Sequence, residues 1–171
     1  MKRLACGEEV KNNTENHTME KKQFTIEINA PLEKVFDIML GLSDKSTYEQ
    51  WTALFNPTST YEGSWEKGQK IHFIGTDDKG NRGGMVARIA ENIPNKFVSI
   101  QHYGILDGDT EITEGPQVDL WAGGHENYRF EKMGEKTRVI VEVDVTDEHS
   151  EYFDSTYPKA LKKLKKLVES S

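Results

Sequence analysis

The sequence has little cysteine, no long apolar run and no excess of positive charge. Its one cysteine among 171 residues is Cys6, which excludes an intrachain disulfide. No apolar run approaches the roughly 20 residues that cross a membrane as a helix, so we expect no membrane span. Residues 1–6 also lack the apolar segment, roughly 7–15 residues long, that an export signal contains. We therefore expect a cytoplasmic protein.

The charge balance argues against two classes of partner. The formal net charge is −7. Nucleic-acid-binding proteins usually carry a basic face, and anionic membrane surfaces attract basic segments. We therefore expect neither nucleic acid nor a membrane surface as the main partner. The composition, 35% apolar and 30% charged residues, is that of one globular domain large enough to bury a core.

The chain divides into a polar leader and one domain. Val10 and Met19 are the large apolar side chains of residues 7–22. A segment of this composition cannot bury enough surface to offset its ordering entropy. We predict a disordered leader over residues 1–21 and a folded domain over residues 22–171.

Apolar periodicity predicts a strand and two short helices at the start of this domain. Residues 23–29 alternate between apolar and polar side chains, as in a half-buried strand. Pro31 suits the first turn of a helix, whose apolar residues then recur at helical spacing until Gly41. Residues 43–57 predict a second short helix that packs inward.

Strands follow these helices, separated by turn residues. The most regular alternation belongs to the last strand, in which four valines share one face. This strand pairs in a hairpin with the preceding one, about a turn at Gly134. The predicted strands are residues 70–76, 84–91, 97–103, 125–133 and 136–146.

Residues 150–169 predict a long amphipathic helix, with lysines on its solvent face and an apolar stripe on the other. Pro158 opposes this prediction, because it removes a backbone donor and should kink the helix or delay its regular part. A sheet with one apolar face needs a cover, and this helix is the element long enough to supply it. The order of elements therefore predicts an α+β fold, a curved antiparallel sheet wrapped around a C-terminal helix.

Four local sequences carry a resemblance to a known superfamily. Residues 24–36 read FTIEINAPLEKVF, a strand that ends in Ala-Pro before a helix with a Val-aromatic pair. Trp51 stands where this superfamily often has a tryptophan after its second helix, and residues 63–68 read GSWEKG. Residues 83–97, GGMVARIAENIPNKF, form a strand-proline-strand segment. In this order they resemble the START and birch-pollen-allergen (SRPBCC) superfamily, and most of all its branch of homologues of the heat-shock-protein-90 ATPase activator.

The resemblance covers residues 22–170 and implies a helix-grip fold. Members of the superfamily bind lipids, sterols, polyketides and other apolar molecules, and a few are cyclases or hydrolases, so the fold alone does not determine function. Residues 104–124 depart from the family pattern. They form either a loop over the mouth of a cavity or a strand extension and a turn, with Trp121 plugging an edge; we favour the second interpretation.

A pocket between the sheet and the last helix is the first candidate site. Its functional interpretation is an apolar cavity with a few polar anchors, and the alternative is a filled core, because the same side chains pack any sheet against any helix. The predicted ligand-binding residues are Trp51, Phe73, Met85, Ile100, His102, Tyr128, Phe130, Phe153, Tyr157 and Leu161.

Histidines offer the second candidate chemistry. His102 shares the predicted core face and needs a hydrogen-bond partner there, for which we expect Tyr128 or Tyr157. It is either a structural residue, which we favour, or a ligand anchor or acid-base group. His125 and Glu126 lie near it, but no close metal-ligand spacing occurs. We therefore expect no metal and no cofactor.

Three functions follow, in this order. The first is binding or transport of a small apolar, lipid-like or polyketide-like ligand without catalysis. The second is an enzyme that acts on such a ligand through His102 and a tyrosine, and the third is a chaperone-accessory interaction module. A second copy of the chain is a further candidate partner, because Ile74 and Ile140 belong to the outer face and edges of the predicted sheet.

Overall fold

One curved antiparallel sheet and three helices make up the part of the chain that the computed structural model describes, residues 19–171. The sheet has eight strands in the order β1-β8-β7-β5-β4-β3-β2, and β6 pairs with β5 off this path. The elements are β1 (Glu20–Ile28), α1 (Leu32–Leu40), α2 (Lys45–Thr52), β2 (Thr60–Gly63), β3 (Lys70–Thr76), β4 (Arg82–Ile93), β5 (Phe97–Asp107), β6 (Thr110–Ile112), β7 (Gly124–Met133), β8 (Lys136–Val145) and α3 (Asp147–Glu169).

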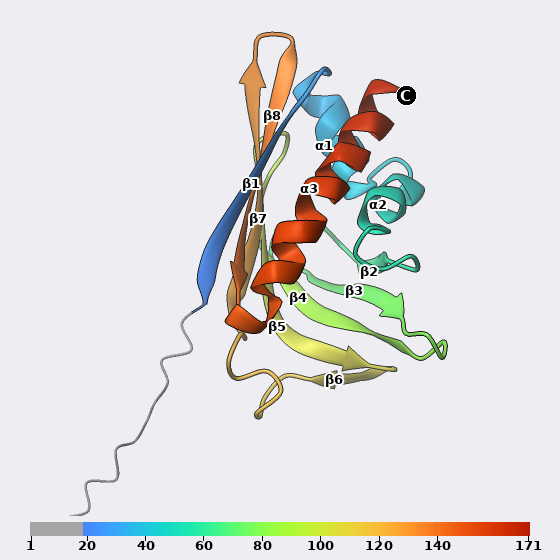
Figure 1. Ribbon diagram of the computed structural model, residues 1–171, viewed down its shortest axis with the longest axis vertical. Helices are drawn as coiled ribbons and strands as arrows, with labels where there is room; N and C mark the ends of the chain where they lie inside the picture. The colour runs from blue at the N-terminus through green and yellow to red at the C-terminus, as the bar shows by residue number, and fades with distance from the viewer. Residues whose placement is uncertain (1–18) are drawn as a thin grey trace, which may run out of the picture.

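The long helix α3 lies across one face of the bent sheet, with α1 and α2 beside it (Figure 1). Its buried side chains recur along one stripe, which includes Tyr157, Leu161 and Leu164. The stripe packs against β1, α1 and α2 in the main core. The predicted α+β helix-grip architecture is therefore confirmed.

The centre of the core comes from β8 and β7. Val139, Val141 and Val143 of β8 are buried on the inner face, as their alternation predicts. Their partners on β7 include Tyr128 and Phe130, which pair with Val141 and Val139. Because adjacent strands place paired residues on the same face, both strands contribute to one apolar layer beneath α3.

Several element bounds differ from the sequence predictions. β1 begins at Glu20, and two residues of the predicted leader 1–21 therefore belong to a strand; residues 1–18 lie outside the described part of the chain. β2 has four residues and no predicted counterpart, because so short a strand shows no periodicity. α3 begins at Asp147 and contains Pro158. Pro158 and Asp154 are both exposed, so water can satisfy the carbonyl oxygen that proline leaves without a donor.

Residues 104–124 form a strand extension and a turn, the interpretation that we favoured. β5 runs on to Asp107 and turns into β6, which pairs back onto it. A turn segment then leads to β7, with the side chain of Val118 fully buried. Trp121 is half-buried, and its Nε1 donates to the carbonyl oxygen of Gln117 at 2.9 Å. Within residues 19–171, no helix has the length and apolar character needed to cross a membrane.

The packing of α3 against the sheet predicts that shortening a buried side chain of its apolar stripe lowers the stability of the protein considerably. Leu164→Ala removes a side chain that is 0% exposed, and we expect a loss of about 2–5 kcal/mol in the free energy of unfolding. The same substitution at Leu42, which is 49% exposed, should change it by less than about 0.5 kcal/mol. Urea unfolding followed by circular dichroism measures both, and equal losses would contradict the packing of α3 described above.

Candidate functional site

A carboxylate lies on the inner, apolar face of the sheet. Glu126 of β7 shares this face with Tyr128 and Phe130, both of which are buried. The Glu126 side chain is 15% exposed. An ionised carboxylate in such surroundings is costly unless other groups compensate its charge and hydrogen-bonding capacity.

Two side chains from other elements supply this compensation. The Tyr157 hydroxyl, from α3, donates to Oε2 of Glu126. His102 Nε2, from β5, lies 3.3 Å from Oε1. The sequence predicted a tyrosine as the partner of His102, which is wrong: in the strand register Ile100 is opposite Glu126, so His102 lies diagonal to the carboxylate. We name Glu126, Tyr157 and His102 the inner polar cluster.

Burial and the charge of Glu126 change the pKa values of three tyrosine side chains in and around this cluster. Burial raises the pKa of Tyr157 well above its ordinary value, and the negative charge of Glu126 raises it further. Burial and the same charge also raise the pKa values of Tyr128 and Tyr48. The three phenols are therefore neutral hydrogen-bond donors at any physiological pH.

His102 has one nitrogen paired and one unpaired. Its Nδ1 is buried and has no hydrogen-bond partner among the described residues. A buried polar atom without a partner costs about 1–3 kcal/mol, and such an atom in a folded protein needs an explanation.

The ten predicted ligand-binding residues all lie on the inner side of the sheet or on the helices that cover it, in two groups. The buried group packs side chain against side chain: Trp51 and Tyr128 have ring centroids 6.2 Å apart, and Trp51 Nε1 donates to the Met39 carbonyl oxygen at 2.8 Å. The buried group is Trp51, Ile100, Tyr128, Phe130, Tyr157 and Leu161. The half-buried group is Phe73, Met85, His102 and Phe153.

Half-buried side chains continue across the inner face of three strands. Phe73 of β3 pairs with Met85 of β4, and Met85 pairs with Ile105 of β5. The rings of Phe73 and His102 are 5.7 Å apart between centroids. We name Phe73, Met85, His102, Ile105 and Glu126 the inner-face patch, an apolar surface that carries a single carboxylate.

Three aromatic residues join the segment after α2 to the start of α3, and two of them contact the Tyr157 ring. The Tyr152 hydroxyl donates to the carbonyl oxygen of Phe55 at 2.9 Å. The ring of Phe55 lies 6.3 Å from that of Phe153 and 4.9 Å from that of Tyr157. We name Phe55, Tyr152 and Phe153 the aromatic latch. Tyr152 is exposed and the other two are half-buried, so the latch lies between solvent and the inner polar cluster.

Two of the hollows at the surface of the described residues lie beside the long helix and beside α1. One, of about 380 Å³, lies between β1 and α3 and is lined by Phe24, Ile26 and Leu161 among others. The other, of about 340 Å³, lies between the start of α1 and the turn that joins β7 to β8. Of the ten predicted ligand-binding residues, Leu161 lines the first.

The three residues weighed as metal ligands do not converge. His102 and Glu126 face inward, whereas His125 Nδ1 pairs with Ser99 Oγ at 2.9 Å, on the alternate positions of the same strands. Within residues 19–171, no group of three histidine, cysteine, aspartate or glutamate side chains has a metal-binding arrangement.

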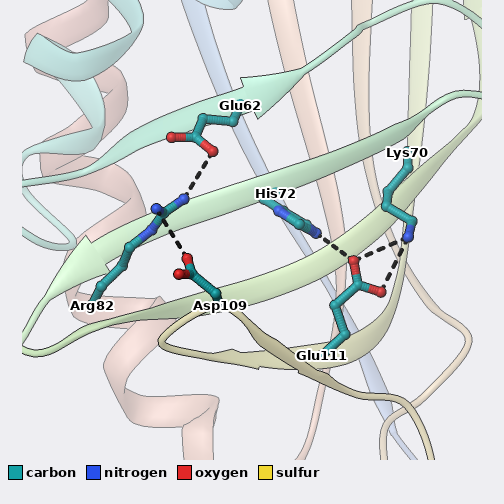
Figure 2. A network of polar contacts seen from close by, with 6 residues as sticks. All are labelled: Glu62, Lys70, His72, Arg82, Asp109 and Glu111. Atoms are coloured by element: carbon teal, nitrogen blue, oxygen red, sulfur yellow. Dashed lines mark hydrogen bonds and ion pairs between the residues drawn. The ribbon is translucent and has the colours of Figure 1, made fainter.

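The outer face of β3 and β4 carries ion pairs instead (Figure 2). Glu111 of β6 accepts from Lys70 Nζ at 3.0 Å and lies 2.8 Å from His72 Nε2. These hydrogen bonds, that of Lys70 foremost, lower the pKa of Glu111. Arg82 bonds Glu62 Oε2 at 2.8 Å, and its other terminal nitrogen lies 3.4 Å from Asp109.

These contacts tie β6 to β3 and tie the turn between β5 and β6 to β4. A side chain at Gly104 would meet the carbonyl oxygen of Ile112 at 2.9 Å, so glycine permits the close approach. Ile74 is 7% exposed there and packs with Val86 and Leu106. Ile74 therefore lies on the outer face, as predicted, but it is buried there and does not offer a surface to a second copy, because Leu106 of β5 packs against it.

Comparison with known proteins defines the fold. No protein-family model matches the sequence, and no curated protein sequence matches it. A solved structure from Nitrosomonas europaea superposes with a TM-score of 0.66 at 14% identity, over 88% of this chain and 94% of its own. One from Arthrobacter aurescens gives 0.64 at 15% identity, over 88% and 87%. The Aha1 dimer from Colwellia psychrerythraea gives 0.62 at 21% identity, over 88% and 97%. At these identities the likeness establishes a helix-grip fold and nothing finer.

The buried phenols predict that stability falls in alkali. The pKa values of Tyr128 and Tyr157 are raised above the value of about 10 for tyrosine in an unfolded chain, so the unfolded state releases protons first as pH rises. Above about pH 10 the folded state then binds more protons, and each phenol lowers stability by up to about 1.4 kcal/mol per pH unit.

Urea unfolding between pH 8 and pH 11 measures this slope. Tyr128→Phe serves as the matched control, because it removes one buried phenol and leaves every lysine in place. Its slope should be shallower by about one proton. Identical slopes for the two proteins would show that Tyr128 is not a buried neutral phenol.

Proposed function

We propose that the chain binds a small, mostly apolar molecule on the inner-face patch, with the inner polar cluster holding its polar end. The observation that carries this proposal is the combination of a half-buried apolar surface with one carboxylate, whose two oxygens are already held by Tyr157 and His102. Small-molecule sites are mostly apolar with a few convergent polar groups, and strongly shifted pKa values often accompany them.

The packing around α3 supports a particular place and entry route for the ligand. Trp51, Tyr128 and Phe130 fill the deep core, so the ligand occupies the half-buried side of the sheet, over Phe73 and Met85. The aromatic latch borders this side. On this proposal, the first turns of α3 move away from Phe55 when a ligand enters. This breaks the hydrogen bond from the Tyr152 hydroxyl to Phe55 and separates the Phe55 ring from the three rings of α3 that it contacts.

The class of ligand follows from the resemblance stated above. The sequence motifs and the helix-grip fold both agree with the SRPBCC superfamily, whose members bind lipid-like and polyketide-like molecules. The binding unit on this proposal is the folded domain, which begins with β1 at Glu20 instead of the predicted residue 22.

Catalysis is a second candidate, favoured by one observation. Glu126 orients His102 through Nε2 and leaves Nδ1 without a partner, an arrangement in which an imidazole can accept a proton from a bound molecule. On this alternative, His102→Ala abolishes turnover of a substrate found for the protein, and unchanged turnover would dismiss it.

A chaperone-accessory role and self-association have less support than ligand binding. The chaperone-accessory role and a second copy of the chain as partner both agree with the likeness to the Aha1 dimer. At 21% identity, that likeness concerns the fold alone. The free edge of β1 offers a surface for a second copy, although Lys165 Nζ already donates to the Glu27 carbonyl oxygen there at 3.0 Å.

Filling the inner-face patch should block binding. We expect a neutral fluorescent probe, N-phenyl-1-naphthylamine, to bind the protein with increased emission. Met85→Trp places a larger side chain on the half-buried inner face. It should raise the Kd of the probe at least about tenfold, which is 1.4 kcal/mol of binding free energy. Fluorescence titration measures the Kd.

Arg88→Trp is the matched control on the same strand. Arg88 is exposed and lies over the Tyr103 ring on the outer face, so the same new side chain should leave the Kd within about twofold. A probe that fails to bind, or one weakened equally by both variants, would overturn the proposed site.

A further inference from the structure

We infer that the ligand presents a hydrogen-bond donor to His102, and that the site rejects molecules with an anionic head. This inference rests on the proposed function and narrows it from small apolar molecules in general to those with a hydroxyl, phenol, amide N–H or ammonium group. Fatty acids and other carboxylates fall outside it.

The contact with Glu126 determines which nitrogen of His102 carries the proton. An ionised carboxylate only accepts hydrogen bonds, and the Tyr157 hydroxyl already donates to Oε2 of Glu126. The Nε2 atom of His102, 3.3 Å from Oε1, must therefore carry the hydrogen. In a neutral imidazole the other nitrogen then has a free lone pair, so Nδ1 is an acceptor.

The Nδ1 acceptor needs a hydrogen-bond donor that the protein does not supply from its described residues. Nδ1 is buried and no donor among residues 19–171 reaches it. His102 belongs to the inner-face patch, with the Phe73 ring 5.7 Å away. A ligand that lies on Phe73 and carries an O–H or N–H group supplies the missing donor. A ketone or ether has only acceptor oxygens there, so it cannot form a hydrogen bond with Nδ1.

The charge of Glu126 limits the ligand further. Within residues 19–171, no lysine or arginine nitrogen lies within 4.0 Å of the Glu126 carboxylate, whose one partner among the basic side chains is His102. Among the described lysines and arginines, none therefore cancels its negative charge. In a half-buried site the repulsion between two carboxylates is only weakly screened, so an anionic ligand head is disfavoured.

Three probes with one aromatic body test the inference: 2-naphthol, its methyl ether and 2-naphthoate. Isothermal titration calorimetry at pH 7.5 measures each Kd. We expect 2-naphthol to bind about tenfold more tightly than the methyl ether, because it makes one additional hydrogen bond. We expect 2-naphthoate to bind at least as weakly as the ether.

Substitutions at His102 separate the acceptor from the rest of the ring. His102→Gln keeps an N–H donor at the position of Nε2 and removes the acceptor at Nδ1, so the preference for 2-naphthol should fall to within about twofold while the ether keeps its affinity. His102→Asn places an amide oxygen at the position of Nδ1 and should retain the preference. Glu126→Gln removes the negative charge and should lower the Kd of 2-naphthoate about tenfold.

The outcomes distinguish the two proposals. If none of the three probes binds, the proposed function itself fails. If all bind but 2-naphthoate matches 2-naphthol, or if the preference survives in His102→Gln, the site exists and the inference about its head group is wrong. Circular dichroism of each variant checks the fold, and His102→Asn still decides the question if His102→Gln does not fold.

Discussion

The packing of α3 into the bend of the sheet is the interaction on which the rest of the structure depends. Tyr157, Leu161 and Leu164 bury one stripe of the helix, and the inner faces of β7 and β8 bury the opposite layer. Neither layer can remove its apolar surface from water alone, at roughly 25 cal/mol per Å². Because Tyr157 belongs to the stripe, the same packing brings its hydroxyl to Glu126. The grip and the inner polar cluster therefore form together.

The two faces of the strands β3 to β5 are specialised differently. On the inner face, Phe73 and Met85 form an apolar surface beside a carboxylate that Tyr157 and His102 hold in place. On the outer face, Glu111 and Arg82 take part in ion pairs around a small apolar cluster (Figure 2). Adjacent residues of a strand point to opposite faces, so one short stretch such as residues 71–74 serves both.

Local pattern predicted most of the fold. The valines of β8 and the bounds of β3 follow from alternation, and the start of α1 from Pro31. The errors have physical causes. β2 is too short to show a period. The predicted C-terminal helix is confirmed, and Pro158 lies inside it because its missing hydrogen bond falls on the solvent side. The same alternation places Glu126 two residues before Tyr128, which signals an inward carboxylate that the list of predicted ligand-binding residues omitted.

The sequence by itself determined the order of the elements, the face of each that is apolar and the helix-grip class, because periodicity is a property of neighbouring residues. The tertiary structure alone decided that Glu126 meets His102, 24 positions away, and Tyr157, 31 positions away. It also decided which aromatic side chains fill the core and which stay half-buried. These contacts depend on strand register and on where α3 crosses the sheet, and both are set by the packing of the whole domain.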